Sequence, residues 1–165
     1  MPVHNLPFFG EIDLAKLEEY YEVTIQLNSN EVELDLNFSV ENIEAGHLNS
    51  LAALLSNLAA IDAGNKAFIE QDYNGAGDTV RMYIDHHLDE IDDEELGNII
   101  DLSNTDVDIK EQLVKALKLI RVGFYPGNEQ DFAVFDYSID PEFTQYLVVL
   151  FRNEKGEIHY ITMES

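Results

Sequence analysis

The densest run of side chains able to do chemistry extends from Asp85 to Glu95, with the sequence DHHLDEIDDEE. On a helix, positions four apart lie on one side, so this run would present pairs of acidic and imidazole groups together. Carboxylate oxygens are the ligands of Ca²⁺ and Mg²⁺, and an imidazole beside a carboxylate suits Zn²⁺ or Mn²⁺. One prediction is therefore a divalent-metal site with the ligands Asp85, His86, Asp89, Glu90 and Asp93.

The same run also fits a solvated acidic surface. Its two histidines are adjacent, whereas the helical zinc signature needs two histidines four residues apart. His87 falls on an apolar stripe, which favours a histidine at the edge of the core over a metal ligand. The later acids suit the start of a helix, where the dipole stabilises carboxylates. They form a candidate interaction surface consisting of Asp92, Glu94 and Glu95.

Two other segments resemble ligand-binding loops but lack residues that such loops require. Residues 101–112 have the outline of a calcium loop, but Asp106 stands where a glycine is required and Gln112 where a bidentate glutamate is required. The loop Gly75-Ala76-Gly77 lacks the lysine of a phosphate-binding loop. The sequence therefore predicts no catalytic residue and no cofactor.

Asp136 interrupts an otherwise apolar strand, and Arg121 and His159 lie on neighbouring segments. A buried carboxylate beside an arginine would be costly unless paired, and such pairs occur at functional sites. An aspartate on the solvated face of a sheet is the commoner arrangement. Alternation places Asp136 on the same face as Phe132 and Val134, so both interpretations stay open.

The elements that would position these groups follow from hydrophobic periodicity. Alternation on either side of 28–30 predicts a hairpin, and apolar stripes between 48 and 120 predict helices. Four further strands joined by short turns predict a meander. We expect an α+β fold: an antiparallel sheet from an N-terminal hairpin and a C-terminal four-strand meander, with a helical middle packed against it, in a single domain of residues 1–165. The same patterns predict a helix over 13–20, a helix break at Gly64, a helix over 109–120 and a strand over 143–151.

Composition restricts the function classes. Asp and Glu number 33 against 9 Lys and Arg, which gives a formal net charge of −24, and there is no cysteine. Disulfides and thiolate chemistry are thereby excluded. The charge disfavours nucleic acid and anionic membranes, which are bound through basic side chains. No signal peptide and no apolar run of about 20 residues is evident, so a cytoplasmic location is expected.

Several segments resemble a known family. The opening LPFFGEIDL (6–14), the acids and tyrosines of 18–21 and the hairpin to Phe38 resemble small acidic bacterial proteins, catalogued as domain-of-unknown-function family number two thousand and four. The segments 124–126, 134–138 and 163–165 are similar too. The resemblance extends over nearly the whole chain. It implies a bacterial, cytoplasmic protein and supplies no activity.

These observations favour a non-enzymatic interaction module that engages a basic protein partner, in the manner of an immunity protein or inhibitor. The alternative is a divalent-metal-binding protein or metal-dependent enzyme that uses the Asp85–Glu95 run. A third reading is that the acidity reflects the salt or pH inside the host. The oligomeric state is left open.

Overall fold

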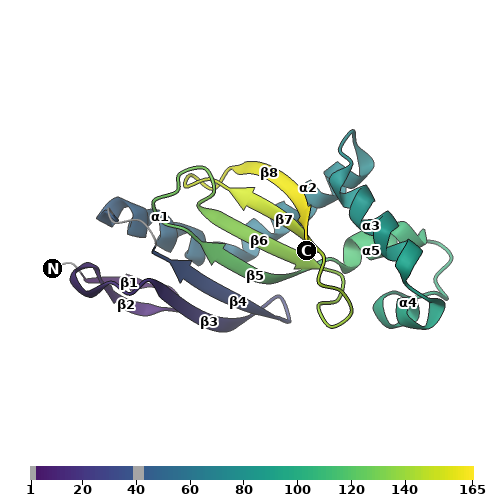
Figure 1. Ribbon diagram of the computed structural model, residues 1–165, viewed down its shortest axis with the longest axis horizontal. Helices are drawn as coiled ribbons and strands as arrows, with labels where there is room; N and C mark the ends of the chain where they lie inside the picture. Colours follow the sequence, from purple (N-terminus) through teal and green to yellow (C-terminus); the bar gives the residue numbers. More distant parts are fainter. Residues whose placement is uncertain (1–2, 39–42) are drawn as a thin grey trace.

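The computed structural model describes residues 3–38 and 43–165. The chain has the predicted α+β fold (Figure 1). Its strands are β1 (Val3–Leu6), β2 (Gly10–Asp13), β3 (Tyr20–Leu27), β4 (Asn30–Asn37), β5 (Lys118–Phe124), β6 (Ala133–Ser138), β7 (Leu147–Arg152) and β8 (Ile158–Glu164). Its helices are the 3₁₀ turn η1 (Leu14–Lys16), α1 (Ala45–Ser56), α2 (Leu58–Asn74), α3 (Thr79–Glu90), α4 (Asp93–Ile99) and α5 (Ile109–Ala116).

The sheet of six strands has the order β3-β4-β5-β6-β7-β8. The predicted hairpin is β3–β4, and its turn is made by Asn28 and Ser29, both with positive φ, as a tight hairpin turn requires. The predicted meander is β5–β8, antiparallel throughout. The hairpin and the meander meet through a parallel β4–β5 pair, so the sheet is mixed rather than wholly antiparallel. A parallel pair needs a long crossover, which here is the helical middle of the chain.

The N-terminal segment differs from expectation. Asp13 caps η1, accepting a hydrogen bond from the Ala15 amide at 2.9 Å, but the predicted helix over 13–20 is wrong. Leu17 already has extended backbone angles, and the alternating segment from Tyr20 onward belongs to β3. A small separate hairpin, β1–β2, precedes it.

The predicted helix break at Gly64 is also wrong, because α2 runs continuously from residue 58 to residue 74. The break falls at Asn57, whose amide closes the last turn of α1. A Cβ on Gly64 would lie 3.2 Å from Nη2 of Arg152. The glycine therefore serves a close approach of α2 to β7 rather than an interruption of the helix.

Two element boundaries near the meander differ from those predicted. The helix predicted over 109–120 ends at Ala116, and β5 follows, with Leu119, Val122 and Phe124 in the core. A register shift between Leu119 and Arg121 interrupts the alternation of β5. The strand predicted over 143–151 begins only at Leu147. At its centre Val148, Val149 and Leu150 are all buried: Val148 and Leu150 belong to the core, and Val149 lies among the side chains of the opposite face.

The helices cover one face of the sheet. Figure 1 shows α1 and α2 behind the strands and α3, α4 and α5 gathered at one end. Two hydrogen bonds join α2 to the sheet: Tyr137 donates to Asp62 at 2.6 Å in a buried position, and Arg152 donates to Asn65 at 2.7 Å in a partly buried one. Within residues 3–38 and 43–165, no helix is both long and apolar enough to cross a bilayer.

Candidate functional site

The face of the six-stranded sheet turned away from the helices, called the open face here, is crossed by none of the described helices (Figure 1). The strand register aligns its side chains in two rows. One row is Glu22, Asp35, Gly123, Val134, Phe151 and Tyr160. The other is Thr24, Glu33, Arg121, Asp136, Val149 and Thr162. Acids dominate the hairpin half of these rows, and apolar and aromatic side chains dominate the β6–β8 half.

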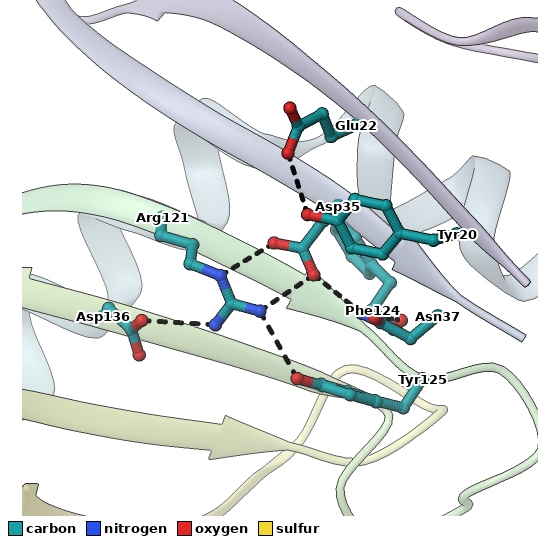
Figure 2. Close-up of polar contacts among 8 residues, drawn as sticks. All are labelled: Tyr20, Glu22, Asp35, Asn37, Arg121, Phe124, Tyr125 and Asp136. Atoms are coloured by element: carbon teal, nitrogen blue, oxygen red, sulfur yellow. Dashed lines mark hydrogen bonds and ion pairs between the residues drawn. The ribbon is translucent and has the colours of Figure 1, made fainter. Parts of the chain in front are cut away.

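Arg121 and Asp35 form the centre of this face (Figure 2). Nη2 of Arg121 donates to Oδ1 of Asp35 at 2.8 Å, and Nε lies 2.7 Å from Oδ2. Asn37 adds a donor, with Nδ2 2.6 Å from Oδ1. Asp35 is wholly buried, and a buried carboxylate requires such partners because transfer out of water is costly.

Gly123 makes this pairing possible. It follows Arg121 by two positions on the same face of β5, and the guanidinium lies close against it. A Cβ at position 123 would lie 2.8 Å from Nη2 of Arg121 and 3.2 Å from Oδ1 of Asp35. Any larger residue would have to displace the arginine.

Arg121 reaches a second carboxylate more loosely. Its Nη1 donates to Oδ2 of Asp136 at 3.3 Å, and its Nη2 donates to the Tyr125 hydroxyl at 3.4 Å. Burial lowers the pKa of the guanidinium, but the hydrogen bond to Tyr125 and the charges of both aspartates outweigh it, so the pKa of Arg121 is raised. Burial raises the pKa of Asp136 in spite of Arg121, and the negative charges of Glu164 and Asp35 add to the effect.

The hairpin half of the open face holds further acids close together. The Tyr20 hydroxyl donates to Oε2 of Glu22 at 2.8 Å. This hydrogen bond, with slight burial and the charges of nearby acids, raises the pKa of Tyr20 to about 12. Burial and the neighbouring Glu22 carboxylate raise the pKa of Glu33, although Arg121 opposes the shift. Negative charge is therefore in surplus here.

Two shallow hollows lie on this face. One, of about 470 Å³, is bordered by Glu31, Glu33 and Lys118 at the far end of the hairpin. The other, of about 450 Å³, is called the β6–β8 hollow here; its lining includes Asp131, Val134, Asp136, Val149, Phe151 and Glu164. Beside it, the rings of Phe151 and Tyr160 stack with centroids 4.2 Å apart and planes within 10°.

The residues predicted as metal ligands lie on α3 and at the start of α4, away from the sheet centre. Nζ of Lys110 is 2.9 Å from Oδ1 of Asp85, and the ring of His86 packs against that of Tyr146 with centroids 4.5 Å apart. Asp89, Glu90 and Asp93 are exposed. Within the part of the chain that the structure describes, no three His, Asp or Glu side chains converge on one point, so the metal site gains no support and stays a prediction.

The residues predicted as an interaction surface form the first turn of α4. Asp92 is its N-cap, accepting from the amide of Glu95 at 2.8 Å, which confirms the expected helix start. Glu94 is exposed, and Glu95 is partly buried. Their carboxylates lie where the helix dipole stabilises negative charge. Whether they contact a partner stays a prediction.

Two further histidines that the sequence analysis singles out, His87 and His159, lie apart from the predicted metal ligands. His87 is buried, as predicted, with Nδ1 donating to the Tyr83 carbonyl at 2.7 Å and Nε2 accepting from the Thr144 hydroxyl at 2.8 Å. His159 does not join Arg121 and Asp136; its Nδ1 lies 3.0 Å from Oδ1 of Asp131.

No family model, curated protein or solved structure matches this chain. The case for a function therefore rests on the geometry of the open face.

Of the residues on the open face, only Asp136 and Arg121 are candidates from the sequence alone. Asp35 looked like any acid on the solvated side of a hairpin, since its burial arises from the parallel pairing with β5, which no local pattern encodes. Gly123 in mid-strand was the available signal, because a glycine inside a strand often marks a close approach. As assembled, the face presents carboxylates to solvent while Arg121 is held by two of them. Such a surface can bind cationic groups.

Proposed function

We propose that this protein is a non-catalytic binding module that engages a basic protein partner, as an immunity protein or inhibitor does when it occupies the cationic site of a toxin or nuclease. The observation that supports the proposal best is the open face. There Glu22, Glu33 and Asp136 stand in surplus over Arg121, whose charge is already taken up largely by Asp35. A face of this composition offers unmatched negative charge on a rigid sheet.

The charge of the whole chain acts in the same direction. At −24, the long-range field attracts a basic partner, accelerates encounter and makes association sensitive to salt. It repels nucleic acid and anionic lipid, which are bound by neutralising phosphates with Lys and Arg. The partner we propose is therefore a protein.

The setting belongs to the proposal as well. We place the protein in the bacterial cytoplasm and in domain-of-unknown-function family number two thousand and four. The support is the resemblance of the segments 6–14 and 18–21, the hairpin to Phe38 and the segments 124–126, 134–138 and 163–165.

Affinity purification of the tagged full chain from its native host tests the proposal. At low salt we expect one basic protein in near-stoichiometric amount, and at high salt we expect it to be released. A matched variant carrying Glu22→Gln and Glu33→Gln should retain less of it at the same salt. If no basic protein is recovered in near-stoichiometric amount at either salt, the proposed function is wrong.

A further inference from the structure

The β6–β8 hollow differs from the rest of the acidic surface because its lining combines carboxylates with apolar side chains. Three acids (Asp131, Asp136 and Glu164) outnumber the one cation of its lining, Arg121, and Val134 and Val149 supply apolar surface. The acids of α3 and α4 project from exposed helical turns. Only a surface that is both hollowed and apolar can bury the stem of a long basic side chain while its charged end meets an acid.

The negative charge at this hollow is incompletely compensated. Asp136 is 7 % exposed, and its contact with Arg121 is a single one at 3.3 Å, whereas Asp35 holds the same guanidinium at 2.7 and 2.8 Å. Asp136 and Glu164 line the same hollow; burial is the main cause that raises the pKa of Asp136, and the negative charge of Glu164 adds to it, so the two acids repel. A cation placed between them would relieve that repulsion.

An aromatic surface adjoins the same carboxylates. Phe151 lines the hollow and stacks on Tyr160, which is 42 % exposed. Asp131 and Glu164 are near enough to Tyr160 to contribute, after burial, to raising the pKa of its hydroxyl. Cations bind against such rings, and a guanidinium does so best because it is planar and weakly hydrated. Arginine also presents a planar fork of N–H donors that matches the geometry of a carboxylate, which the ammonium group of lysine lacks.

We infer that the β6–β8 hollow is the anchor site for an arginine side chain of the basic partner, with its guanidinium between Asp136 and Glu164 beside the Phe151–Tyr160 pair and its methylene stem on Val134 and Val149. This inference rests on the proposed function and names the contact through which it works. Buried arginines are common among the few residues that dominate binding energy at protein interfaces.

The test uses the isotope-labelled full chain and two short capped peptides, one alternating glycine with arginine and the other alternating glycine with lysine. Titrated at low salt and followed by amide chemical shifts, the arginine peptide should perturb residues of β6, β7 and β8 most. It should also bind about threefold to tenfold more tightly than the lysine peptide, the margin that a cation–aromatic contact provides.

Matched variants separate the hollow from general charge. Glu164→Gln and Glu94→Gln each remove one exposed charge, the first at the hollow and the second on α4. Glu164→Gln should weaken arginine-peptide binding by about fivefold, an effect expected of a charged hydrogen-bonded contact, whereas Glu94→Gln should change it less than about twofold. Tyr160→Ala should remove the preference for arginine over lysine. Glu164 and Tyr160 lie on the edge strand β8. An amide spectrum that is unchanged outside β8 and its neighbours verifies that these two variants are folded.

Three results would overturn the inference: no binding of the arginine peptide at low salt, perturbation centred on α3 and α4, or equal losses in the two charge variants. Each would leave the proposed function standing if the host still yields a salt-sensitive basic partner. Conversely, specific peptide binding with no partner in the host would contradict the proposed function and not the chemistry of the hollow.

Discussion

Arg121, Asp35 and Gly123 form a unit in which each residue depends on the other two. The carboxylate is buried because the guanidinium covers it, and the guanidinium can cover it because position 123 has no side chain. Removing one partner of a buried ion pair costs more than the pair itself contributes, since an uncompensated charge is left behind. Two predictions follow at this scale.

Gly123→Ala should destabilise the protein by about 1–3 kcal/mol, the usual cost of forcing extra atoms into a packed site, because the new methyl group would displace Arg121. Urea denaturation measures the loss. The same substitution made together with Arg121→Met should cost clearly less, since the displaced group is absent. An equal loss in both backgrounds would show that the methyl group acts through something other than Arg121.

Arg121→Met should lower the free energy of unfolding by about 3–5 kcal/mol, because it leaves Asp35 buried without its cation. Adding Asp35→Asn should recover part of this loss, since the amide carries no charge to leave unpaired. Thermal and urea unfolding of the single and double variants provide the comparison. A double variant less stable than Arg121→Met alone would contradict the account.

At the scale of elements, α2 and α3 are held by polar contacts in addition to apolar packing. Arg152 of β7 lies against Gly64 of α2, fixed by Asn65 and by the carbonyl of Gly156 at 2.5 Å. His87 of α3 joins the preceding turn of its helix to the loop that precedes β7, through Thr144. Each contact makes a prediction about the element that carries it.

Gly64→Ala should fail to stabilise α2, although replacing glycine in a helix interior usually gains about 1 kcal/mol. The new Cβ would lie 3.2 Å from Nη2 of Arg152, whose guanidinium is held on two sides and cannot easily retreat. Gly46→Ala, in the first turn of α1, is the control, because no atom of the described residues lies within 4 Å of its new Cβ. Thermal unfolding should show Gly64→Ala to be less stable than Gly46→Ala, and the reverse order would contradict the close-approach explanation.

His87 should make the protein less stable in mild acid. Burial lowers its pKa in the folded state, with His86 adding to this and the Tyr83 carbonyl opposing it. The folded state therefore binds fewer protons than the unfolded state. Stability is fully present above the unfolded pKa of about 6.5 and is lost as pH falls from there through the folded pKa.

Unfolding free energies measured between about pH 7 and pH 5 check the sign of this effect. In His87→Gln the part of the decline that belongs to this residue should disappear, whereas in His86→Gln it should largely remain. If His87→Gln declines as steeply as the parent protein, the lowered pKa of His87 is not its cause.

At the scale of the whole molecule, the net charge of −24 is distributed over folded surfaces. Like charges on a compact body repel one another, and salt screens them over about 10 Å at 0.1 M. Salt should therefore raise the melting temperature for reasons unconnected with any site, and divalent cations should do so more strongly.

This behaviour provides a test of the metal-binding alternative. We expect Ca²⁺, Mg²⁺, Mn²⁺ and Zn²⁺ at millimolar concentration to raise the melting temperature equally in the parent protein and in a variant with His86→Ala and Asp89→Ala, because the described side chains do not converge there. A thermal-shift assay makes the comparison. Loss of the shift for one ion in the variant alone would establish a site, since an ion that binds only the folded state stabilises it.

The sequence predicted the features that neighbouring residues determine and missed those that depend on contacts between distant segments. The hairpin, the meander strands, the cap at Asp13, the helix start after the acidic run and the burial of His87 follow from periodicity and neighbouring residues. The continuity of α2 at Gly64 does not, because its cause is a guanidinium from β7. The candidate site was foreseen only in the Arg121–Asp136 pair; the burial of Asp35 results from a pairing between distant strands.

That pairing also has a consequence for how the chain folds. Arg121 and Asp35 are 86 residues apart in sequence, so the contact at the centre of the sheet closes a long loop. During synthesis the β3–β4 hairpin emerges early, and the edge of β4 that pairs with β5 stays exposed until β5 has left the ribosome. Contacts of such separation slow folding, and an unpaired edge is prone to association with other chains. The acids along β4 repel those of another nascent hairpin, and this repulsion disfavours pairing of two chains through the exposed edge before β5 is available.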